Sequence, residues 1–207
     1  MDNQELYNQY FVKIAFERED LFKAILSNYS CRSVLYPGSF VHITPSFIFP
    51  EVIYVDNDSR AKKFFKNNDD VKKIITLNKQ YFEESKITFF GQSYLKPIDI
   101  PECSVDLLIS QYAGFISLYC KKYLKKGGIL LVNSSHGDAA MANLDNDYKF
   151  IGVVKKQGKV HKISDNELDS YFIPKKPIKV TRSYLEKTKK GIAYTKSATS
   201  YIFEKRI

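Results

Sequence analysis

Two short polar stretches, each following an apolar run, hold the residues best suited to chemistry. They are "YPGS" at 36–39 and "DND" at 56–58. A strand, a glycine turn, a connection and a second strand with an acidic end are typical of the start of a nucleotide-binding half-fold, because glycine lets the backbone approach a ligand closely. This turn has one glycine where such folds usually have three. The stretch is therefore either a cofactor site or the remains of one.

The elements that position these stretches are predicted by hydrophobic pattern. The runs at 34–36, 52–55, 105–110 and 129–132 are continuous rather than alternating, which indicates strands covered on both faces. Helical patterns alternate with them. We therefore predict an α/β, Rossmann-like fold with a mainly parallel twisted sheet flanked by helices. Longer, more polar patterns near 148–156 and 199–206 predict a closing antiparallel C-terminal hairpin.

The helical segments are predicted from apolar spacing and end signals. In the first third of the chain we expect one or two helices over 6–28, a short packed helix or turn over 41–51, and a helix capped by Asp58 or Ser59. A loop at 67–70 should precede a helix over 71–85 and a short strand at 87–90. A helix over 114–124 should end at "KKGG", and further helical material is expected near 165–171 and 182–187.

Length and composition predict one main domain. The chain has 207 residues, of which 44% are hydrophobic and 14% aromatic, enough for a sizeable core. We expect residues 1–30 to form an N-terminal helical segment packing on the sheet, and 31–207 to form the α/β domain. No apolar run approaches the ~18 residues that span a membrane, and the start is acidic. The sequence thus predicts a cytoplasmic protein without a membrane partner.

Cysteine spacing and charge bear on metals and partners. Cys31, Cys103 and Cys120 are far apart, which predicts buried free thiols and no metal site.

The net charge of the chain is +9, and the region from residue 149 onward contains 15 basic residues and 5 acidic ones. This basic C-terminal region could attract nucleic acid or anionic substrates. The alternative is a Lys-rich composition alone, because arginine, which favours bidentate phosphate contacts, is scarce.

Five segments occur in an order that resembles a known family. They are "VLYPGS", "VIYVDND", "ITFFGQSY", "SVDLLISQYAGF" and "YLKKGGILLV". Together they are similar to the class I S-adenosylmethionine-dependent methyltransferases, over most of the chain from Ser33 on. The resemblance implies a Rossmann-like sheet, S-adenosylmethionine as cofactor, and methyl transfer to an acceptor that the sequence does not identify.

The resemblance also implies which residues contact the cofactor. Asp56 stands where the family holds the ribose hydroxyls. The matching positions are Tyr36, Pro37, Gly38 and Ser39 in the glycine turn, Asp56, Asn57 and Asp58 after the second strand, Gln92 and Ser93 on the adenine side, and Gln111 after the fourth strand.

The glycine turn departs from the family pattern. Tyr36 stands at the acidic position, and Phe40 and His42 stand at glycine positions, where they add side chains where the family needs room. Gly38 and Ser39 could still offer backbone N–H groups and a hydroxyl.

Two residues are candidates for the substrate side. Tyr112 and His136 follow the fourth and fifth strands, and ligands bind beyond the carboxyl ends of such strands. His136 could act as a general base, or be a solvent-facing loop residue. Methyl transfer asks little of side chains, so no further catalytic residue is predicted. We expect His42 to be structural and His161 to be exposed.

Two functional hypotheses stand close together. One is a methyltransferase. The other is a non-catalytic methyltransferase-like binding or assembly module, possibly associated with nucleic acid, although no RNA-binding signature is visible. A nicotinamide oxidoreductase is less favoured, because the GxGxxG turn is absent.

Overall fold

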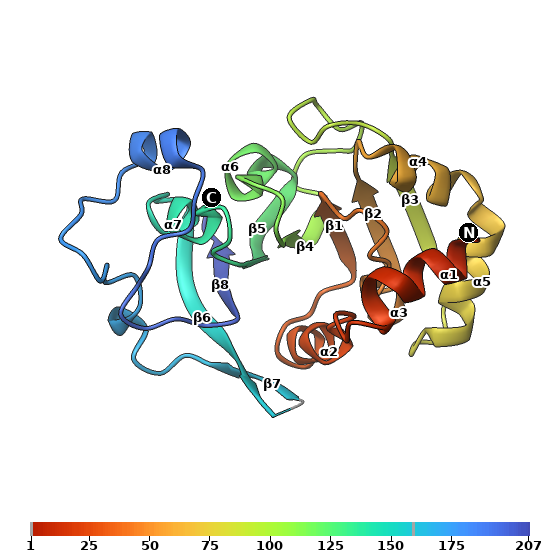
Figure 1. The fold of residues 1–207 in the computed structure, drawn as a ribbon, viewed down its shortest axis with the longest axis horizontal. Helices are drawn as coiled ribbons and strands as arrows, with labels where there is room; N and C mark the ends of the chain where they lie inside the picture. The colour runs from red at the N-terminus through yellow and green to blue at the C-terminus, as the bar shows by residue number, and fades with distance from the viewer. Residues whose placement is uncertain (1, 159) are drawn as a thin grey trace.

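One eight-stranded sheet organises the chain (Figure 1). The computed structural model describes residues 2–158 and 160–207. The strand order is β3-β2-β1-β4-β5-β8-β6-β7. The strands are β1 (Ser33–Pro37), β2 (Glu51–Val55), β3 (Lys86–Phe90), β4 (Val105–Ser110), β5 (Leu124–Val132), β6 (Tyr148–Gln157), β7 (Val160–Ser164) and β8 (Ser200–Lys205).

The direction of the strands confirms the predicted fold class. β1 lies between β2 and β4 and is parallel to both, and β3 and β5 continue the parallel part of the sheet. β8 is antiparallel to β5 and to β6, and β7 is antiparallel to β6. The expected C-terminal pair, β6 and β8, is thus adjacent and antiparallel, with β7 between them in sequence. The sheet is Rossmann-like and closed by antiparallel strands.

Helices cover both faces of the sheet. Figure 1 shows α1 to α5 gathered around β1–β3, and α6 to α8 nearer β4–β8. The helical elements are α1 (Asn3–Tyr7), the π-helical η1 (Asn8–Val12), α2 (Glu19–Asn28), α3 (Pro45–Ile48), α4 (Ser59–Lys66), α5 (Asn68–Asn78), α6 (Ile116–Tyr119), α7 (Asp138–Asn143) and α8 (Arg182–Thr188), with 3₁₀ turns η2 (Lys121–Tyr123) and η3 (Leu168–Ser170).

Alternate residues of each central strand enter different cores. In β4, Leu107 and Ile109 pack with α1 to α5, and Leu108 packs with α6 and α7 on the other face. All three are fully buried. Burial on both faces is the reason that this strand appears in the sequence as a continuous apolar run. Leu21, Phe22 and the rest of the buried face of α2 join the first core.

Several element boundaries in two regions differ from the prediction. The expected loop at 67–70 is largely helix, because α5 begins at Asn68, with Asp69 and Asp70 in its first turn where carboxylates are favoured. That helix ends at Asn78 rather than at Ser85. The expected helix over 114–124 contains only α6 and a 3₁₀ turn. β5 begins at Leu124, which pairs with Val105, so "KKGG" lies inside a strand and not at a helix end.

Two burial predictions are wrong, those for Cys103 and His161. Cys103 is exposed, whereas Cys31 and Cys120 are buried free thiols. His161 is buried, because β7 packs against α2 and the His161 Nδ1 contacts Asp20 Oδ2 at 2.5 Å. Lys159, one of the basic C-terminal residues, lies outside the described residues.

Within residues 2–158 and 160–207, none of the helices combines the length and apolarity that crossing a bilayer requires.

Candidate functional site

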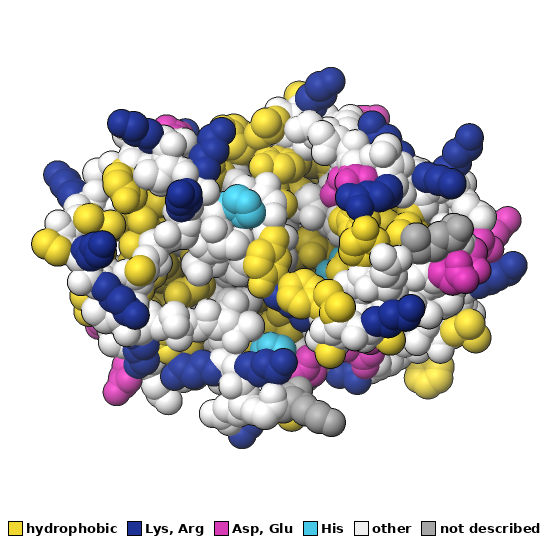
Figure 2. Space-filling view, in the orientation of Figure 1, with side chains coloured by type: hydrophobic (Ala, Val, Ile, Leu, Met, Phe, Trp, Pro, Cys, Tyr) yellow, Lys and Arg dark blue, Asp and Glu magenta, His cyan; other side chains and the backbone are white. Residues whose placement is uncertain are grey.

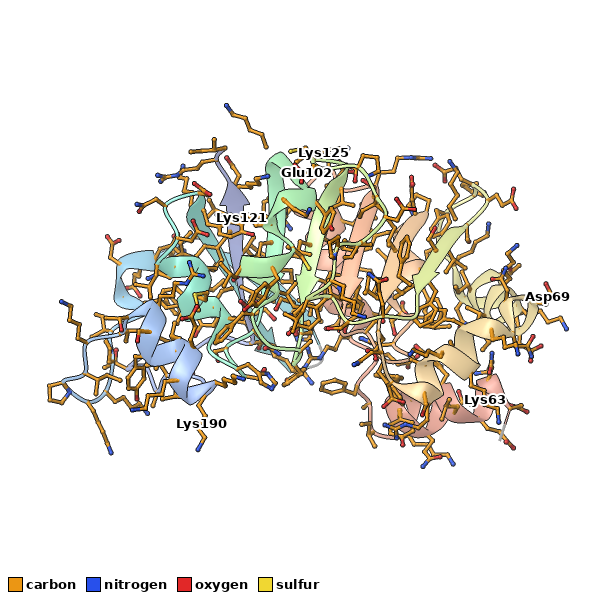
Figure 3. All side chains as sticks on the ribbon, turned by 90° about the horizontal axis from the view of Figure 1, so that it is seen from above. Lys63, Asp69, Glu102, Lys121, Lys125 and Lys190 are labelled. Carbon is orange, nitrogen blue, oxygen red and sulfur yellow. The ribbon has the colours of Figure 1, made fainter. Side chains whose placement is uncertain are left out.

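The carboxyl ends of the parallel strands meet at one edge of the sheet. Glu102 and Lys125 mark the opposite edge, and Lys190 lies on the carboxyl-end side (Figure 3). A hollow of about 340 Å³, the first hollow, opens at this edge. It is lined by Gly38, Val55, Asp56, Asn57, Gln92, Ser93, Tyr94, Leu95, Tyr112 and Ala113. Four segments far apart in sequence therefore form one concave site, where open α/β sheets bind ligands.

Asp56 is fixed by the backbone around it. Its Oδ2 accepts a hydrogen bond from the Phe40 N–H at 2.7 Å, and its Oδ1 accepts one from the Asp58 N–H at 2.8 Å. The side chain is half-buried at the rim of the first hollow. A carboxylate has about four lone-pair positions, so two acceptor positions remain for a ligand's hydroxyl groups.

The neighbouring carboxylate has a different task. Asp58 caps α4 by accepting from the Arg60 N–H at 2.7 Å, and it pairs with the Arg60 guanidinium at 2.7 Å. These contacts with Arg60 lower the pKa of Asp58 to about 2. Asp58 does not line the first hollow. Its acidic character is explained by the helix cap and the ion pair.

Glycine is required at position 38 because the loop after β4 packs closely against it. Its φ is +66°, and a Cβ at this position would lie 2.1 Å from the Cβ of Ala113. Its N–H is donated to Val55 O at 2.8 Å. The single glycine of the turn thus lets the loop after β1 touch the loop after β4. Its N–H is not available to a ligand, contrary to expectation.

Ser39, Pro37 and Tyr36 do not line the first hollow. Ser39 is 2% exposed, and its hydroxyl donates to Phe40 O at 3.3 Å. Tyr36 is also buried, and burial raises the pKa of its hydroxyl. These three residues of the turn belong to the core instead of the cofactor surface.

The loop after β3, which holds Gln92 and Ser93, is built around an aromatic residue. Gln92 donates its side-chain N–H to Pro97 O at 2.8 Å, and Ser93 Oγ accepts from the Leu95 N–H at 3.3 Å. Tyr94 donates its hydroxyl to Ala113 O at 2.7 Å and so ties this loop to the one after β4. The loop is held in shape by its own polar groups and presents Tyr94 and Leu95 to the hollow.

The other half of the expected cofactor site is filled by aromatic side chains. Phe40 has a φ of +50° and packs edge-on against Tyr10 at 4.9 Å between ring centroids, with the Arg60 guanidinium 4.6 Å away. His42 is 3% exposed and stacks on Phe11 at 4.4 Å. The two positions where the family has glycines are therefore occupied by packed rings.

His42 has no role available beyond packing. Its Nε2–H donates to Glu17 O at 2.9 Å, and its Nδ1 accepts from the Tyr36 hydroxyl at 3.1 Å. Burial lowers the pKa of His42 to about 3, so the ring is neutral. This confirms the structural interpretation of His42.

Arg18 holds the N-terminal segment against the ends of the strands. Its guanidinium donates to Gln111 Oε1 at 2.5 Å and to the Tyr112 hydroxyl at 2.7 Å, and lies 4.0 Å from the Phe16 ring centroid. Gln111 is 4% exposed and does not line the first hollow, whereas Tyr112 lines it and is 51% exposed. No local sequence pattern indicates the role of Arg18, because its partners lie more than 90 positions away.

A second hollow of about 150 Å³ adjoins the first. It shares Tyr94 and Leu95 with the first hollow, and its other lining residues are Gly114, Phe115, Tyr119, His136 and Lys189. The half-buried His136 thus lies at this second hollow and not at the first. The two substrate-side candidates, Tyr112 and His136, belong to adjoining hollows.

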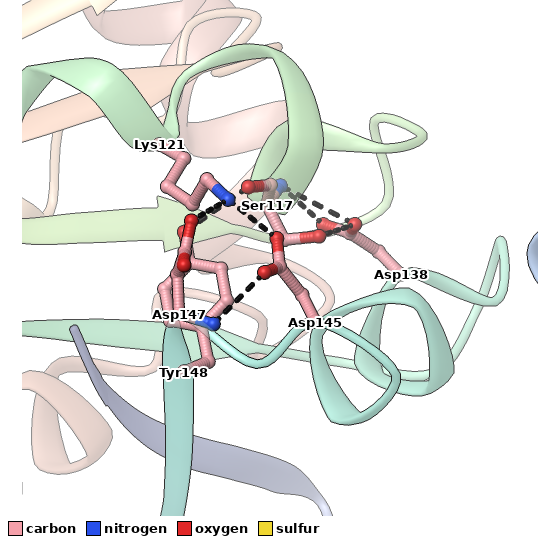
Figure 4. Close-up of polar contacts among 6 residues, drawn as sticks. All are labelled: Ser117, Lys121, Asp138, Asp145, Asp147 and Tyr148. Carbon is pink, nitrogen blue, oxygen red and sulfur yellow. Dashed lines mark hydrogen bonds and ion pairs between the residues drawn. The ribbon is translucent and has the colours of Figure 1, made fainter. Parts of the chain in front are cut away.

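The carboxylate of Asp138 is buried and is hydrogen-bonded to Ser117 (Figure 4). Asp138, the first residue of α7, accepts from the Ser110 hydroxyl and the Ser117 hydroxyl, each at 2.5 Å, and from the Ser117 N–H. Burial raises the pKa of Asp138 to about 6, although these hydrogen bonds act in the opposite direction. Nearby, Lys121 pairs with Asp145 at 2.7 Å and with Asp147. The hydrogen bonds of Asp138 join β4, α6 and α7 in the interior, whereas Lys121, Asp145 and Asp147 line a separate hollow of about 410 Å³.

Neither a metal cluster nor a basic stripe is evident. Among the described residues, no group of three or more His, Cys, Asp or Glu side chains could hold a metal ion. Figure 2 shows the Lys and Arg side chains scattered over the visible face instead of forming one continuous patch. Several basic residues are paired, such as Lys196 with Glu167 at 2.5 Å.

No family model and no curated protein matches this sequence. Solved structures do. The chain resembles the YcgJ protein from Bacillus subtilis (16% identity, 59% of this chain and 54% of that chain, TM-score 0.41) and an S-adenosylmethionine-dependent O-methyltransferase from Thermotoga maritima (10%, 92% and 65%, TM-score 0.48). It also resembles a methyltransferase from Geobacter sulfurreducens (9% identity, 78% of this chain and 86% of that chain, TM-score 0.48). The chain spans about half the length of the Bacillus protein.

The strand order and direction define a class I methyltransferase-like, Rossmann-like fold. Similarities at this level of identity and TM-score carry no functional argument. What the site can do therefore follows from the two hollows and from the residues that close the methionine side.

Proposed function

We propose that the chain is an S-adenosylmethionine-dependent methyltransferase whose first hollow binds the adenosyl part of the cofactor. The observation that carries this proposal is the half-buried carboxylate of Asp56, which faces a hollow of nucleoside size between the ends of β1, β2, β3 and β4. A carboxylate held by two backbone N–H groups is preorganised to accept hydrogen bonds from the vicinal hydroxyls of a ribose. When bound, the cofactor supplies a methyl group that its sulfonium already activates.

The methionine end of the cofactor requires a binding site other than the glycine turn that the family uses. Phe40 and His42 fill the space beside the turn, and Tyr36 replaces the acid. Arg18 is a cation at the same edge, next to Tyr112 of the first hollow. We propose that Arg18 pairs with the carboxylate of the cofactor's amino-acid end, because a guanidinium matches a carboxylate in charge and in shape.

A second candidate function is a nucleoside-binding module without methyl transfer. The observation that favours it is the hydrogen bonding of Arg18 to Gln111 and Tyr112, since a guanidinium already satisfied by the protein can close a site instead of binding a ligand. The fate of Arg18 therefore distinguishes the two functions.

Calorimetric titration with adenosine and with S-adenosylhomocysteine tests the proposal. The methyltransferase proposal predicts that S-adenosylhomocysteine binds about tenfold or more tightly than adenosine, the worth of one or two charged contacts. Arg18→Ala should remove that preference and leave the affinity for adenosine unchanged. Arg60→Ala is the matched control, because Arg60 also lies over aromatic rings but its contacts are with Asp58, Tyr10 and Phe40, none of which lines the hollow.

A different response of ligand affinity to Arg18→Ala supports the nucleoside-binding module. If Arg18 only closes the site, the native protein should bind S-adenosylhomocysteine and adenosine about equally, and Arg18→Ala should strengthen binding of both ligands or leave both affinities unchanged. Absence of binding by both ligands at millimolar concentration contradicts both functions.

A further inference from the structure

The second hollow is of a size that holds one six-membered ring. Its volume is about 150 Å³, and apolar cavities of that volume bind benzene. Tyr94, Phe115 and Tyr119 form aromatic walls, with the Tyr94 and Tyr119 ring centroids 6.3 Å apart. Tyr94 and Leu95 also line the first hollow, so a ring bound here would be separated from a bound nucleoside by these two shared residues.

The aromatic wall is held in place before any ligand arrives. The Tyr94 hydroxyl donates to Ala113 O at 2.7 Å and lies over Gly114, where a Cβ would come within 2.6 Å of it. Phe115 is 7% exposed and packs with Met141 and Leu185. Because Tyr94 and Phe115 are already held in place, little of their side-chain entropy is lost when a flat ligand binds.

A chain of hydrogen bonds determines which nitrogen of His136 is free to accept a proton. The Ser135 hydroxyl donates its single proton to Asn133 Oδ1 at 2.9 Å. Ser135 Oγ can therefore only accept from His136 Nδ1, which lies 3.0 Å away. The proton of the neutral imidazole is thus on Nδ1, and Nε2 carries the lone pair.

The chain continues to the strand ends. Asn133 is 6% exposed and donates its side-chain N–H to Gln111 Oε1 at 3.3 Å, and Gln111 Oε1 also accepts from Arg18. The orientation of His136 is therefore coupled to Arg18, which in turn contacts Tyr112 of the first hollow.

Lys189 adds a positive charge to the same hollow. It follows α8 with a φ of +50°, and its N–H is donated to Leu185 O at 2.7 Å, which fixes where the side chain begins. The next residue, Lys190, does not line the hollow, and its side chain points away from the body of the molecule (Figure 3). A base and a cation beside an aromatic wall favour a ligand that becomes an anion when it loses a proton.

We infer that the second hollow binds a single aromatic ring bearing an ionisable hydroxyl, with His136 Nε2 accepting the hydroxyl proton and Lys189 facing the resulting phenolate oxygen. The O–H bond breaks, its electron pair stays on oxygen, and the proton moves to Nε2 to give an imidazolium. Ser135 is a positioning residue, because it holds the proton of His136 on Nδ1. That this phenol is the methyl acceptor rests on the proposed function.

Absorption titration with 4-nitrophenol tests the site, because the phenolate of this probe has its own visible band. At a pH where the free probe is mainly protonated, the protein should bind it and increase that band. Nitrobenzene, which lacks the hydroxyl, should bind at least tenfold more weakly. His136→Gln should abolish the increase, and Ser135→Ala should reduce it while leaving nitrobenzene affinity unchanged. Lys189→Ala should weaken binding about tenfold, and the control Lys190→Ala should not.

Three results would overturn the inference: equal affinity for the two probes, a full phenolate band with His136→Gln, or equal effects of Lys189→Ala and Lys190→Ala. Titration of the same samples with S-adenosylhomocysteine separates this inference from the proposed function. Binding of S-adenosylhomocysteine without 4-nitrophenol removes the ring site alone. Binding of 4-nitrophenol without S-adenosylhomocysteine supports the ring site and removes its role as methyl acceptor.

Discussion

Replacing Asp56 by asparagine should separate ligand binding from stability. Asn keeps one acceptor oxygen and no charge, so one of the two backbone N–H groups, of Phe40 or Asp58, loses its acceptor and the other keeps only a neutral one. At this half-buried position we expect a loss of about 1–2 kcal/mol in the free energy of unfolding. For a chain of 207 residues that lowers Tm by about 2–8 °C.

The same change should weaken nucleoside binding more than it weakens the fold. The amide nitrogen of Asn cannot accept from a ribose hydroxyl, and a hydrogen bond to a charged group is worth about 1.5–3 kcal/mol. Calorimetry should therefore show adenosine and S-adenosylhomocysteine binding about ten- to a hundredfold more weakly to Asp56→Asn.

The control for Asp56→Asn is Asp58→Asn. Asp58 caps α4 and pairs with Arg60 but does not line the first hollow. Its replacement should cost about 1 kcal/mol of stability or less, because Asn is also a good helix cap, and should leave nucleoside affinity unchanged. Equal losses of affinity in the two variants, or unchanged affinity in Asp56→Asn, would refute the assignment of Asp56 to the ribose.

Three further predictions concern the framework of the site. Asp138 is buried and its pKa is raised to about 6, so the folded protein holds a proton that the unfolded chain loses near pH 4, and the contribution of Asp138 to stability falls as the pH rises from about 4 to 6. Relative to the native protein, the free energy of unfolding of Asp138→Asn, measured with denaturant, should therefore increase by about 3 kcal/mol between pH 4 and 7. A difference that does not depend on pH would contradict this. Gly38→Ala should lower the free energy of unfolding by more than about 2 kcal/mol, because its Cβ would meet Ala113. The control is Gly127→Ala, which has a φ of +74° and no neighbour within 4 Å and should lower it by about 1 kcal/mol. Equal losses in the two variants would contradict the packing argument. Among the described residues, the Tyr171 hydroxyl is buried without a hydrogen-bond partner, so Tyr171→Phe should raise Tm by about 2–4 °C in calorimetry, and a lower Tm would reveal a partner.

The fold could be predicted from sequence because each central strand carries its own signal. Burial on both faces makes β2, β4 and the second half of β5 continuous apolar runs, and Asp58 marks the start of α4. The boundaries that failed depend on tertiary contacts. The pairing of Leu124 with Val105 extends β5 backward through two glycines, which a local pattern interprets as a helix end.

The site was only partly predictable for the same reason. Asp56, Asn57, Gln92, Ser93 and Tyr112 follow recognisable strands, and all of them line the first hollow. Arg18 contacts Gln111 across 93 positions and His161 contacts Asp20 across 141, so no local pattern could reveal either pair. The role of Gly38 was also hidden, because it depends on the approach of Ala113 from another loop.

A crystal structure of the protein with S-adenosylhomocysteine tests the central claim most directly. The account predicts that the ribose hydroxyls lie within hydrogen-bond distance of Asp56, that the adenine lies against the loop of Gln92 to Leu95, and that the amino-acid carboxylate lies at Arg18. A nucleoside bound outside the first hollow, or a ribose that makes no contact with Asp56, would contradict it.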